Sequence, residues 1–132
     1  WTCLLIEPCK KYKSILKENR PDSIIESSAI VPKSHGQVLF YERINTGLSS
    51  LEEIKDNSID ESAFLPYYVD TTTLSEVLEK YQLPKEIDFL SIDVEGLEFE
   101  ILASLDFSDL TIGVICVEHN FRDDREKIST VG

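Results

Sequence analysis

The sequence predicts an α/β fold in which helices flank a mostly parallel sheet, and three observations lead to this class. Short apolar runs typical of buried strands alternate with segments of helical periodicity along the 132 residues. A helix-start signal, Thr73-Leu74-Ser75-Glu76, comes directly after one strand-like run. Three strand-like runs end in polar or acidic residues, as expected where parallel strands present a binding edge. The length suits one core, so residues 1–132 are expected to form a single domain.

The chain opens with a predicted strand and an amphipathic helix. Residues 3–6 form an apolar run that Glu7-Pro8 ends, which predicts a buried strand. Residues 9–19 then show helical spacing, and Pro21 ends the segment. The apolar face of this helix would consist of Tyr12, Ile15 and Leu16.

Two further strands and a long loop are predicted next. Residues 23–31 and residues 37–44 are rich in β-forming side chains, and the turn Ser34-His35-Gly36 separates them. His35 is therefore expected to be a plain turn residue. Residues 45–64 are polar and predict a long loop, which in a compact domain is usually functional or disordered.

The second half of the chain continues the alternation. Residues 65–70 predict a short strand, and Thr73 and Glu76 then form a capping box in which each side chain satisfies a free amide at the helix start. The apolar stripe of that helix would be Leu74, Val77, Leu78 and Tyr81.

Two strands with a helix between them complete the predicted fold. Residues 87–94 predict a strand, and Glu95-Gly96 leads from it into a helix. Residues 111–117 are the most hydrophobic run and predict a buried strand. The inward side chains of the helix would be Leu97, Ile101, Leu102 and Leu105.

The charge of the chain excludes some partners. The formal net charge is -12, and such a surface repels phosphate backbones, so no nucleic acid is expected to bind. Solubility is the plain explanation of the acidity, and an acidic-tail function is the alternative. No apolar run approaches the roughly 20 residues that span a bilayer, so no membrane association is expected.

Cysteine usage indicates the compartment. Cys3, Cys9 and Cys116 are odd in number and show no paired spacing, which argues against disulfides and favours a reducing, cytoplasmic location. Cys3 and Cys116 lie in apolar runs, where a free cysteine behaves as a small hydrophobe. The sequence contains no Met, so we expect either a processed chain or a piece of a longer gene.

The polar strand ends are the candidate functional residues. If the strands are parallel and adjacent, Glu7, Asp93 and Glu118 mark the tips of neighbouring strands and share one edge. Glu7 could accept two hydrogen bonds from a ribose diol, or could be a solvated acid that the following helix dipole favours.

Four residues at the ends of the later strands could form an acidic pocket. The residue types alone are compatible with several functions for it. The pocket could provide a general base, a divalent metal site or a cage for a cationic sulfonium. The alternative is that these are loop acids, with Glu95 and Glu98 complementing a helix start. The pocket residues are Asp93, Glu95, Glu118 and His119.

Several common catalytic motifs are absent from the sequence. No phosphate-binding G-x-x-x-x-G-K-[ST] and no G-x-G-x-x-G occurs, and no nucleophile elbow G-x-S-x-G is present. Kinase, dehydrogenase and α/β-hydrolase functions therefore lose their main support. No Cys/His spacing suggests structural zinc.

One block of sequence resembles the signature of the FkbM methyltransferase family. The block is I-D-F-L-S-I-D-V-E-G-L-E-F-E-I-L, residues 87–102. Three more segments agree in order: W-T-C-L-L-I-E-P-C-K-K-Y at residues 1–12, N-R-P at residues 19–21 and V-E-H-N at residues 117–120. Thr73-Leu74-Ser75 before the capped helix also matches, so the resemblance covers almost the whole chain.

That resemblance implies a Rossmann-like class I methyltransferase core that uses S-adenosylmethionine to methylate a hydroxyl of a sugar or small metabolite. Glu7 would hold the adenosine ribose, and Ser28 and Ala29 would lie near the adenine. Asp93 would contact the methionine end of the cofactor. The residues implied to act in catalysis are Asp93, Glu95 and His119, and those implied to bind the acceptor are Glu118 and Asn120.

The sequence also departs from the family pattern. The first strand with its glycine-rich loop and the last strands are expected outside this stretch, and Cys3 replaces a usual glycine. The missing first strand would lie in the middle of the sheet. We therefore expect direct pairing of its neighbours, or a partner chain such as a second copy in a homodimer, to cover the unpaired edges. The alternatives to an enzyme are a non-catalytic, possibly dimerising domain and an acidic metal-binding module.

Overall fold

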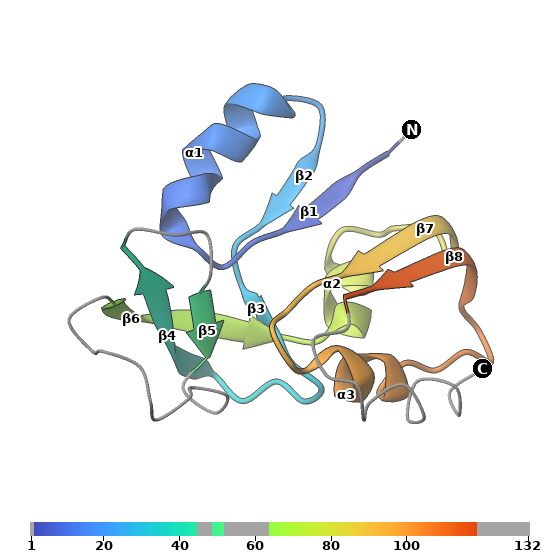
Figure 1. Ribbon diagram of the computed structural model, residues 1–132. Coiled ribbons are helices and arrows are strands. Elements are labelled where there is room, and N and C mark those ends of the chain that lie inside the picture. Colours follow the sequence, from blue (N-terminus) through green and yellow to red (C-terminus); the bar gives the residue numbers. More distant parts are fainter. Residues whose placement is uncertain (1, 45–48, 52–63, 119–132) are drawn as a thin grey trace. The chain divides into compact units, whose positions relative to one another are not determined.

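The structure is a computed structural model, and it describes residues 2–44, 49–51 and 64–118 (Figure 1). Three helices and eight strands form within these residues, which confirms a mixed α/β protein. The chain separates into two compact units. The first holds Trp1–Ile30 and His35–Thr72, and the second holds Val31–Ser34 and Thr73–Gly132. A single domain over the whole chain stays a prediction.

The first unit begins with a parallel strand–helix–strand motif. Strand β1 (Leu4–Ile6) pairs in parallel with β2 (Ile24–Glu26), and helix α1 (Lys10–Asn19) connects them. A crossover of this kind is what two neighbouring parallel strands require. Ile6 lies opposite Glu26 in the register, so both strands end at the same edge. The predicted first strand and first helix are confirmed as elements, but the strand is half-buried where the sequence predicted a buried one.

Helix α1 is more exposed than its spacing predicts. None of its described side chains is buried, and Ile15 of the predicted apolar face is 48% exposed. Tyr12 and Leu16 are half-buried. The strands that α1 joins are three residues long, so they offer little surface for the helix to cover.

A four-stranded mixed sheet forms the rest of the first unit. Its order is β3 (Ala29–Ile30), β6 (Phe64–Thr72), β4 (Gln37–Arg43) and β5 (Ser49–Leu51). Strand β4 is antiparallel to both neighbours, whereas β3 is parallel to β6. This sheet is mixed, where a mostly parallel sheet was expected. The short β4–β5 connection accounts for one antiparallel pair, because parallel neighbours need a crossover of a dozen or more residues.

The strand predicted over residues 23–31 is two strands in different sheets. The cause is the side chain of Glu26, which bends the chain between β2 and β3. Its Oε1 accepts hydrogen bonds from the Ser27 amide at 2.9 Å, the Ser28 amide at 3.0 Å and the Ser28 hydroxyl at 2.8 Å. These contacts form a turn in place of a continuous strand.

Strand β5 lies inside the segment predicted as a loop over residues 45–64, so that prediction is wrong at residues 49–51. Residues 45–48 and 52–63 lie outside the described residues.

The core of the first unit includes an aromatic contact in the mixed sheet, where Tyr67 packs against Phe40 with ring centroids 5.6 Å apart. The buried apolar side chains of the first unit are Cys9, Ala29, Val38, Phe40, Leu51 and Val69.

The second unit opens with the capped helix that the sequence predicts. Helix α2 (Leu74–Lys80) begins after Thr73, whose hydroxyl accepts the Glu76 amide at 3.2 Å. The Glu76 carboxylate accepts the Thr73 amide in return at 2.7 Å. Leu74 and Val77 are buried, so the capping box and the start of the apolar stripe are confirmed.

A second parallel strand–helix–strand motif completes this unit. Strands β7 (Glu86–Ile92) and β8 (Thr111–Val117) pair in parallel, and α3 (Glu98–Ala103) lies between them in the chain. Gly113 is required in β8 because a Cβ there would meet the Asp88 carbonyl oxygen at 2.8 Å. The buried apolar side chains around this motif are Ile92, Ile101, Leu102 and Leu105.

Strand β8 has the predicted bounds, but the prediction that it is buried is wrong. Val114 is 56% exposed and Ile115 is 40% exposed, and Phe89, the partner of Val114 in β7, is 56% exposed. Cys3 and Cys116 are exposed as well, against the expectation for their apolar runs. A two-stranded sheet leaves more of each face open than the continuous sheet that the sequence suggests.

The described strands form three sheets in which β1 pairs only with β2 and β7 only with β8. Direct pairing of the two central edges, or their coverage by a partner chain, stays a prediction. Within the described part of the chain, every helix is too short or too polar to cross a bilayer.

Candidate functional site

The turn after β1 carries Glu7, the residue predicted to bind a ribose. Glu7 is half-buried, and its Oε1 accepts the Cys9 amide at 2.8 Å. The Glu7 amide donates to the Glu26 carbonyl at 3.0 Å, which continues the β1–β2 ladder by one residue. The carboxylate is therefore held beside the shared tip of two parallel strands, where ligands bind in α/β folds.

Ser28 belongs to the same edge of the first unit. It follows the tip of β2, and Glu26 accepts both its amide and its hydroxyl. Ala29 begins β3 and is 2% exposed, so it contributes packing at this position and little accessible surface. Glu26 was not among the predicted site residues. The signal for it is an acid at a strand end followed by Ser27-Ser28, where three donors lie within reach of one carboxylate.

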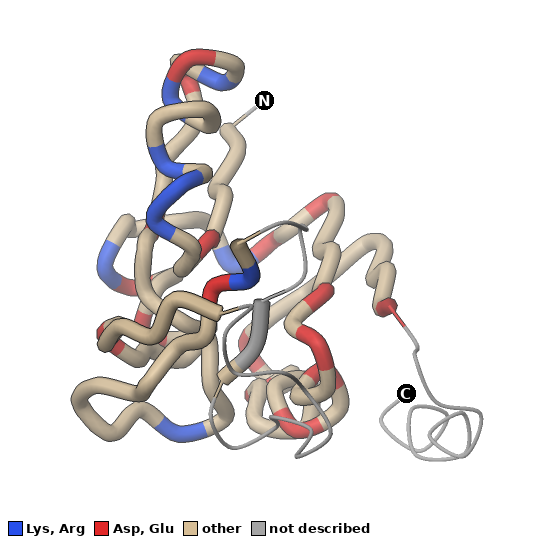
Figure 2. The backbone as a smooth tube through the Cα atoms, turned by 60° about the vertical axis from the view of Figure 1, so that its left-hand side comes forward, with Lys and Arg blue, Asp and Glu red and all other residues tan. Residues whose placement is uncertain are grey.

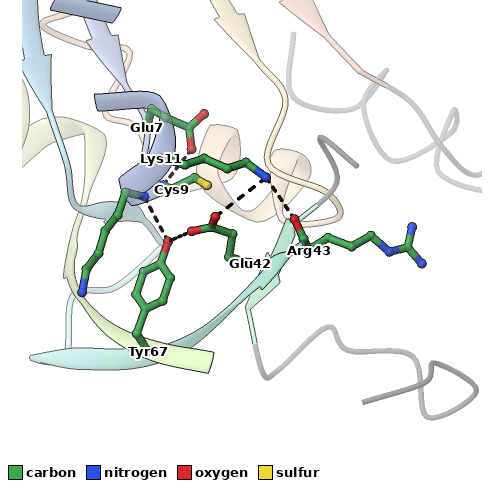
Figure 3. Close-up of polar contacts among 7 residues, drawn as sticks. Glu7, Cys9, Lys11, Glu42, Arg43 and Tyr67 are labelled. Atoms are coloured by element: carbon green, nitrogen blue, oxygen red, sulfur yellow. Dashed lines mark hydrogen bonds and ion pairs between the residues drawn. The ribbon is translucent and has the colours of Figure 1, made fainter. Parts of the chain in front are cut away.

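The start of α1 is held by side chains from the mixed sheet (Figure 3). The Lys10 amide donates to the Tyr67 hydroxyl at 3.0 Å, and this hydroxyl donates to Glu42 Oε2 at 2.8 Å. Lys11 Nζ donates to the Arg43 carbonyl at 3.0 Å and lies 3.8 Å from Glu42 Oε1. The helix-capping residue provides no side-chain bond of its own, so Tyr67 satisfies an amide that would otherwise lack an intrahelical partner.

Two groups in this cluster stay protonated at neutral pH. Burial, as the largest cause, raises the pKa of the Tyr67 phenol above its ordinary value, and the hydrogen bond to Glu42 adds to the effect. Burial also raises the pKa of the Cys9 thiol. Tyr67 is therefore a lasting donor to Glu42, and Cys9 is a packed thiol with little nucleophilic character.

The turn after β7 is held by Glu98, a second residue that sequence reasoning did not place at the site. Glu98 is 8% exposed, and its carboxylate accepts the Val94 amide at 2.9 Å and the Gly96 amide at 3.0 Å. Glu95 and Gly96 have φ values of 60° and 126°, a backbone that only tight turns demand. The spacing E-G-x-E is the sequence signal for this turn.

That turn brings three of the predicted acidic residues together. Asp93, Glu95 and Glu118 each offer a carboxylate oxygen, and these oxygens lie within 4.8 Å of one another. Glu118 follows β8, and its amide donates to the Ile92 carbonyl at 3.0 Å, so the two strand tips stay paired. The predicted convergence of the β7 and β8 ends is confirmed. We call these three residues the acidic cluster.

The carboxylates of the acidic cluster influence one another. A hydrogen bond and the charge of Asp93 are the main causes that raise the pKa of Glu118 to about 7. Burial, and then the charges of Asp93 and Glu98, raise the pKa of Glu95. Two adjacent carboxyls hold one proton more easily than two full charges, which explains the raised pKa of Glu118, whereas burial is the main cause for Glu95.

No basic residue of the same stretch neutralises the acidic cluster. Residues 86–118 contain no Lys or Arg. In the first unit, by contrast, the blue positions of Figure 2 include the lysines of α1. The acidic cluster can therefore act as a base near neutral pH, attract an organic cation, or supply oxygen ligands to a divalent metal.

Two of the predicted site residues, His119 and Asn120, lie outside the described residues. Glu7, Ser28 and Ala29 belong to the first unit, and the acidic cluster belongs to the second. One edge shared by all of them stays a prediction.

Comparison with known protein families defines the class of protein. The family model described as the methyltransferase FkbM domain matches residues 1–130, which is nearly the whole chain, so the protein is a methyltransferase by family. The chain belongs to the FkbM methyltransferase family, as its sequence motifs predict. No curated protein and no solved structure matches it.

Proposed function

We propose that this protein transfers a methyl group from S-adenosylmethionine to a hydroxyl of a sugar or small metabolite, in the cytoplasm, within a Rossmann-like class I core. Family membership supports methyl transfer. The observation that carries the proposed role of the site is the acidic cluster: Asp93, Glu95 and Glu118 meet at the ends of two neighbouring parallel strands.

The residues after β1 and β2 fit the nucleoside part of this cofactor. Glu7 is a half-buried carboxylate fixed through the Cys9 amide, and each of its oxygens has more than one lone pair to offer. A carboxylate in this place accepts hydrogen bonds from a ribose diol. Ser28, at the tip of the neighbouring strand, would lie near the adenine.

The acidic cluster fits the reacting end. The cofactor supplies an activated methyl group on a positively charged sulfur. Asp93 and Glu95 favour a cation nearby, because residues 86–118 provide no competing positive side chain. A hydroxyl acceptor needs a base, and the Asp93–Glu118 pair takes up a proton near neutral pH, where a general base works best. His119 would be a further base, and Glu118 and Asn120 would bind the acceptor.

A second candidate function is divalent metal binding by a non-catalytic domain, possibly one that dimerises through its strand edges. The observation in its favour is the same set of carboxylate oxygens within 4.8 Å. Three such oxygens are typical of magnesium or manganese sites.

The test is methyl transfer from labelled S-adenosylmethionine to a panel of sugars and small hydroxyl compounds. Asp93→Asn should lower the rate at least about 100-fold, the range for losing a general base. The control is Asp88→Asn, because Asp88 is an exposed acid in β7 outside the acidic cluster. Equal rates for wild type and Asp93→Asn would contradict the proposed role of Asp93.

Thermal shift separates the two functions. S-adenosylhomocysteine, the expected product, should raise the melting temperature of the wild type by mass action. A rise with manganese and none with S-adenosylhomocysteine would favour the metal-binding function instead.

A further inference from the structure

The start of α1 is tied to two distant strands, and the same turn carries Glu7. Lys10 lies three positions after Glu7, and its amide donates to the Tyr67 hydroxyl at 3.0 Å. Tyr67 lies in β6, 57 positions further along the chain. The Glu7 carboxylate is in turn bonded to the Cys9 amide, next to Lys10. Moving the helix start would therefore move the carboxylate.

Glu42 in β4 contacts both Tyr67 and Lys11 and so links the start of α1 to a second strand. One of its oxygens accepts the Tyr67 hydroxyl at 2.8 Å, and the other lies 3.8 Å from Lys11 Nζ. The Glu42 side chain is only 12% exposed, so water competes weakly for these contacts. A backbone amide can only donate and a carboxylate oxygen accepts, so the Tyr67 hydroxyl accepts from Lys10 and donates to Glu42. Burial raises the pKa of Tyr67, which keeps the donated proton in place.

We propose that Tyr67 and Glu42 are positioning residues for Glu7, and that they set how strongly the site prefers a nucleoside carrying both ribose hydroxyls. The inference rests on the proposed function, because it takes Glu7 as the group that binds the ribose. It adds two residues, from β4 and β6, that touch no ligand and act through the turn after β1 (Figure 3). Holding a carboxylate in one geometry matters because hydrogen bonds weaken steeply when they are misaligned.

The experiment compares two ligands on the full chain by calorimetric titration. The ligands are S-adenosylhomocysteine and its 2′-deoxy analogue, and the measured quantity is the ratio of their dissociation constants. The wild type should prefer the ribose form by about tenfold or more, as expected for a hydrogen bond to a charged group. Glu7→Gln should remove most of that preference.

Tyr67→Phe should lower the preference at least about threefold, since the ring still packs while the hydroxyl bonds are lost. Glu42→Gln keeps the size of the side chain and removes its charge, and it should give a smaller loss in the same direction. The matched control is Tyr68→Phe, because Tyr68 is the adjacent residue and is 64% exposed. The control should keep the wild-type ratio.

The double variant Glu7→Gln with Tyr67→Phe decides whether Tyr67 acts through Glu7. The ratio should be no lower than in Glu7→Gln alone, because the two changes remove the same interaction. Equal weakening of both ligands by Tyr67→Phe, with the ratio unchanged, would overturn the inference and leave the proposed function standing. A wild type that binds neither ligand would overturn the proposed function and the inference together.

Discussion

Both units hold the turns at their strand ends with side-chain hydrogen bonds, but these bonds span different distances along the sequence. Each places a buried carboxylate beside the tip of a parallel strand, where it accepts backbone amides of the following turn: Glu26 after β2 and Glu98 after β7. In the first unit the neighbouring turn after β1 gains a further tie from Tyr67, 57 positions away. In the second unit the hydrogen bonds by which Glu98 holds the turn after β7 span four positions or fewer.

The difference in reach has a consequence for function. A turn held by hydrogen bonds between near neighbours in the sequence does not depend on the packing of distant strands. Such a turn can hold the acidic cluster together, although its carboxylates would repel one another in an open loop. A turn held by distant strands is sensitive to the packing of those strands, which allows residues far from a ligand to tune it.

Glu26→Ala should cause the largest loss of stability. Three donors lose their shared acceptor, and the side chain removed is only 5% exposed. The free energy of unfolding, measured by urea denaturation, should fall by about 3 kcal/mol. The control is Glu18→Ala in α1, where the side chain is exposed and a change within about 0.5 kcal/mol is expected. A loss no larger than that of the control would show that the β2–β3 turn needs no carboxylate.

Glu98→Ala should come next, with a fall of about 2 kcal/mol, because two amides lose a buried charged acceptor. Because its bonds are local, faster hydrogen exchange should be confined to the turn between β7 and α3. Glu100→Ala is the matched control, since Glu100 lies in the same helix and is exposed. Faster exchange throughout the described part of both units would contradict the local character of this turn.

Thr73→Ala should lower the unfolding free energy by about 1 kcal/mol through loss of the α2 capping box. Thr73→Ser keeps the hydroxyl that accepts the Glu76 amide and should recover most of the loss. Thermal unfolding followed by circular dichroism measures both variants. If the serine variant were as unstable as the alanine variant, the methyl group and not the cap would be responsible.

The smallest effect should be a pH dependence from the acidic cluster. The pKa of Glu118 is about 7 in the folded chain, above its ordinary value of 4.5. The folded state therefore binds more protons than the unfolded state between these values, so stability falls as pH rises from about 4.5 to about 7.

Carboxyl-selective NMR titration measures this directly. In Asp93→Asn the Glu118 pKa should move down toward its ordinary value, because the partner that shares the proton loses its charge. An unchanged Glu118 pKa in this variant would rule out Asp93 as the cause.

The features that could be predicted from the sequence are those with local causes. The capping box at Thr73 depends on residues three positions apart, and β8 is bounded as predicted because its apolar run is continuous. The meeting of Asp93 and Glu118 followed from one rule, that neighbouring parallel strands end at the same edge. The spacing E-G-x-E was a local signal that Glu98 holds the turn after β7. From the sequence we instead considered Glu98 as an acid that complements a helix start.

The features that could not be predicted depend on residues far away in the sequence, or on whether another layer of the structure covers a strand. Nothing in the sequence around Lys10 indicates that a tyrosine in β6 will satisfy its amide. The apolar run of β8 cannot reveal that Val114 and Ile115 are exposed, because periodicity does not show whether another layer covers a strand.

An NMR titration of the wild type with S-adenosylhomocysteine tests whether both units respond to the expected product of the cofactor. Saturable shifts should occur both at the amides of Cys9 and Ser28, after β1 and β2, and at those of Val94 and Gly96, after β7. That result would show that residues of all three turns respond to this ligand. Shifts in only one of the units, or in neither, would contradict the proposed roles of Glu7 and of the acidic cluster.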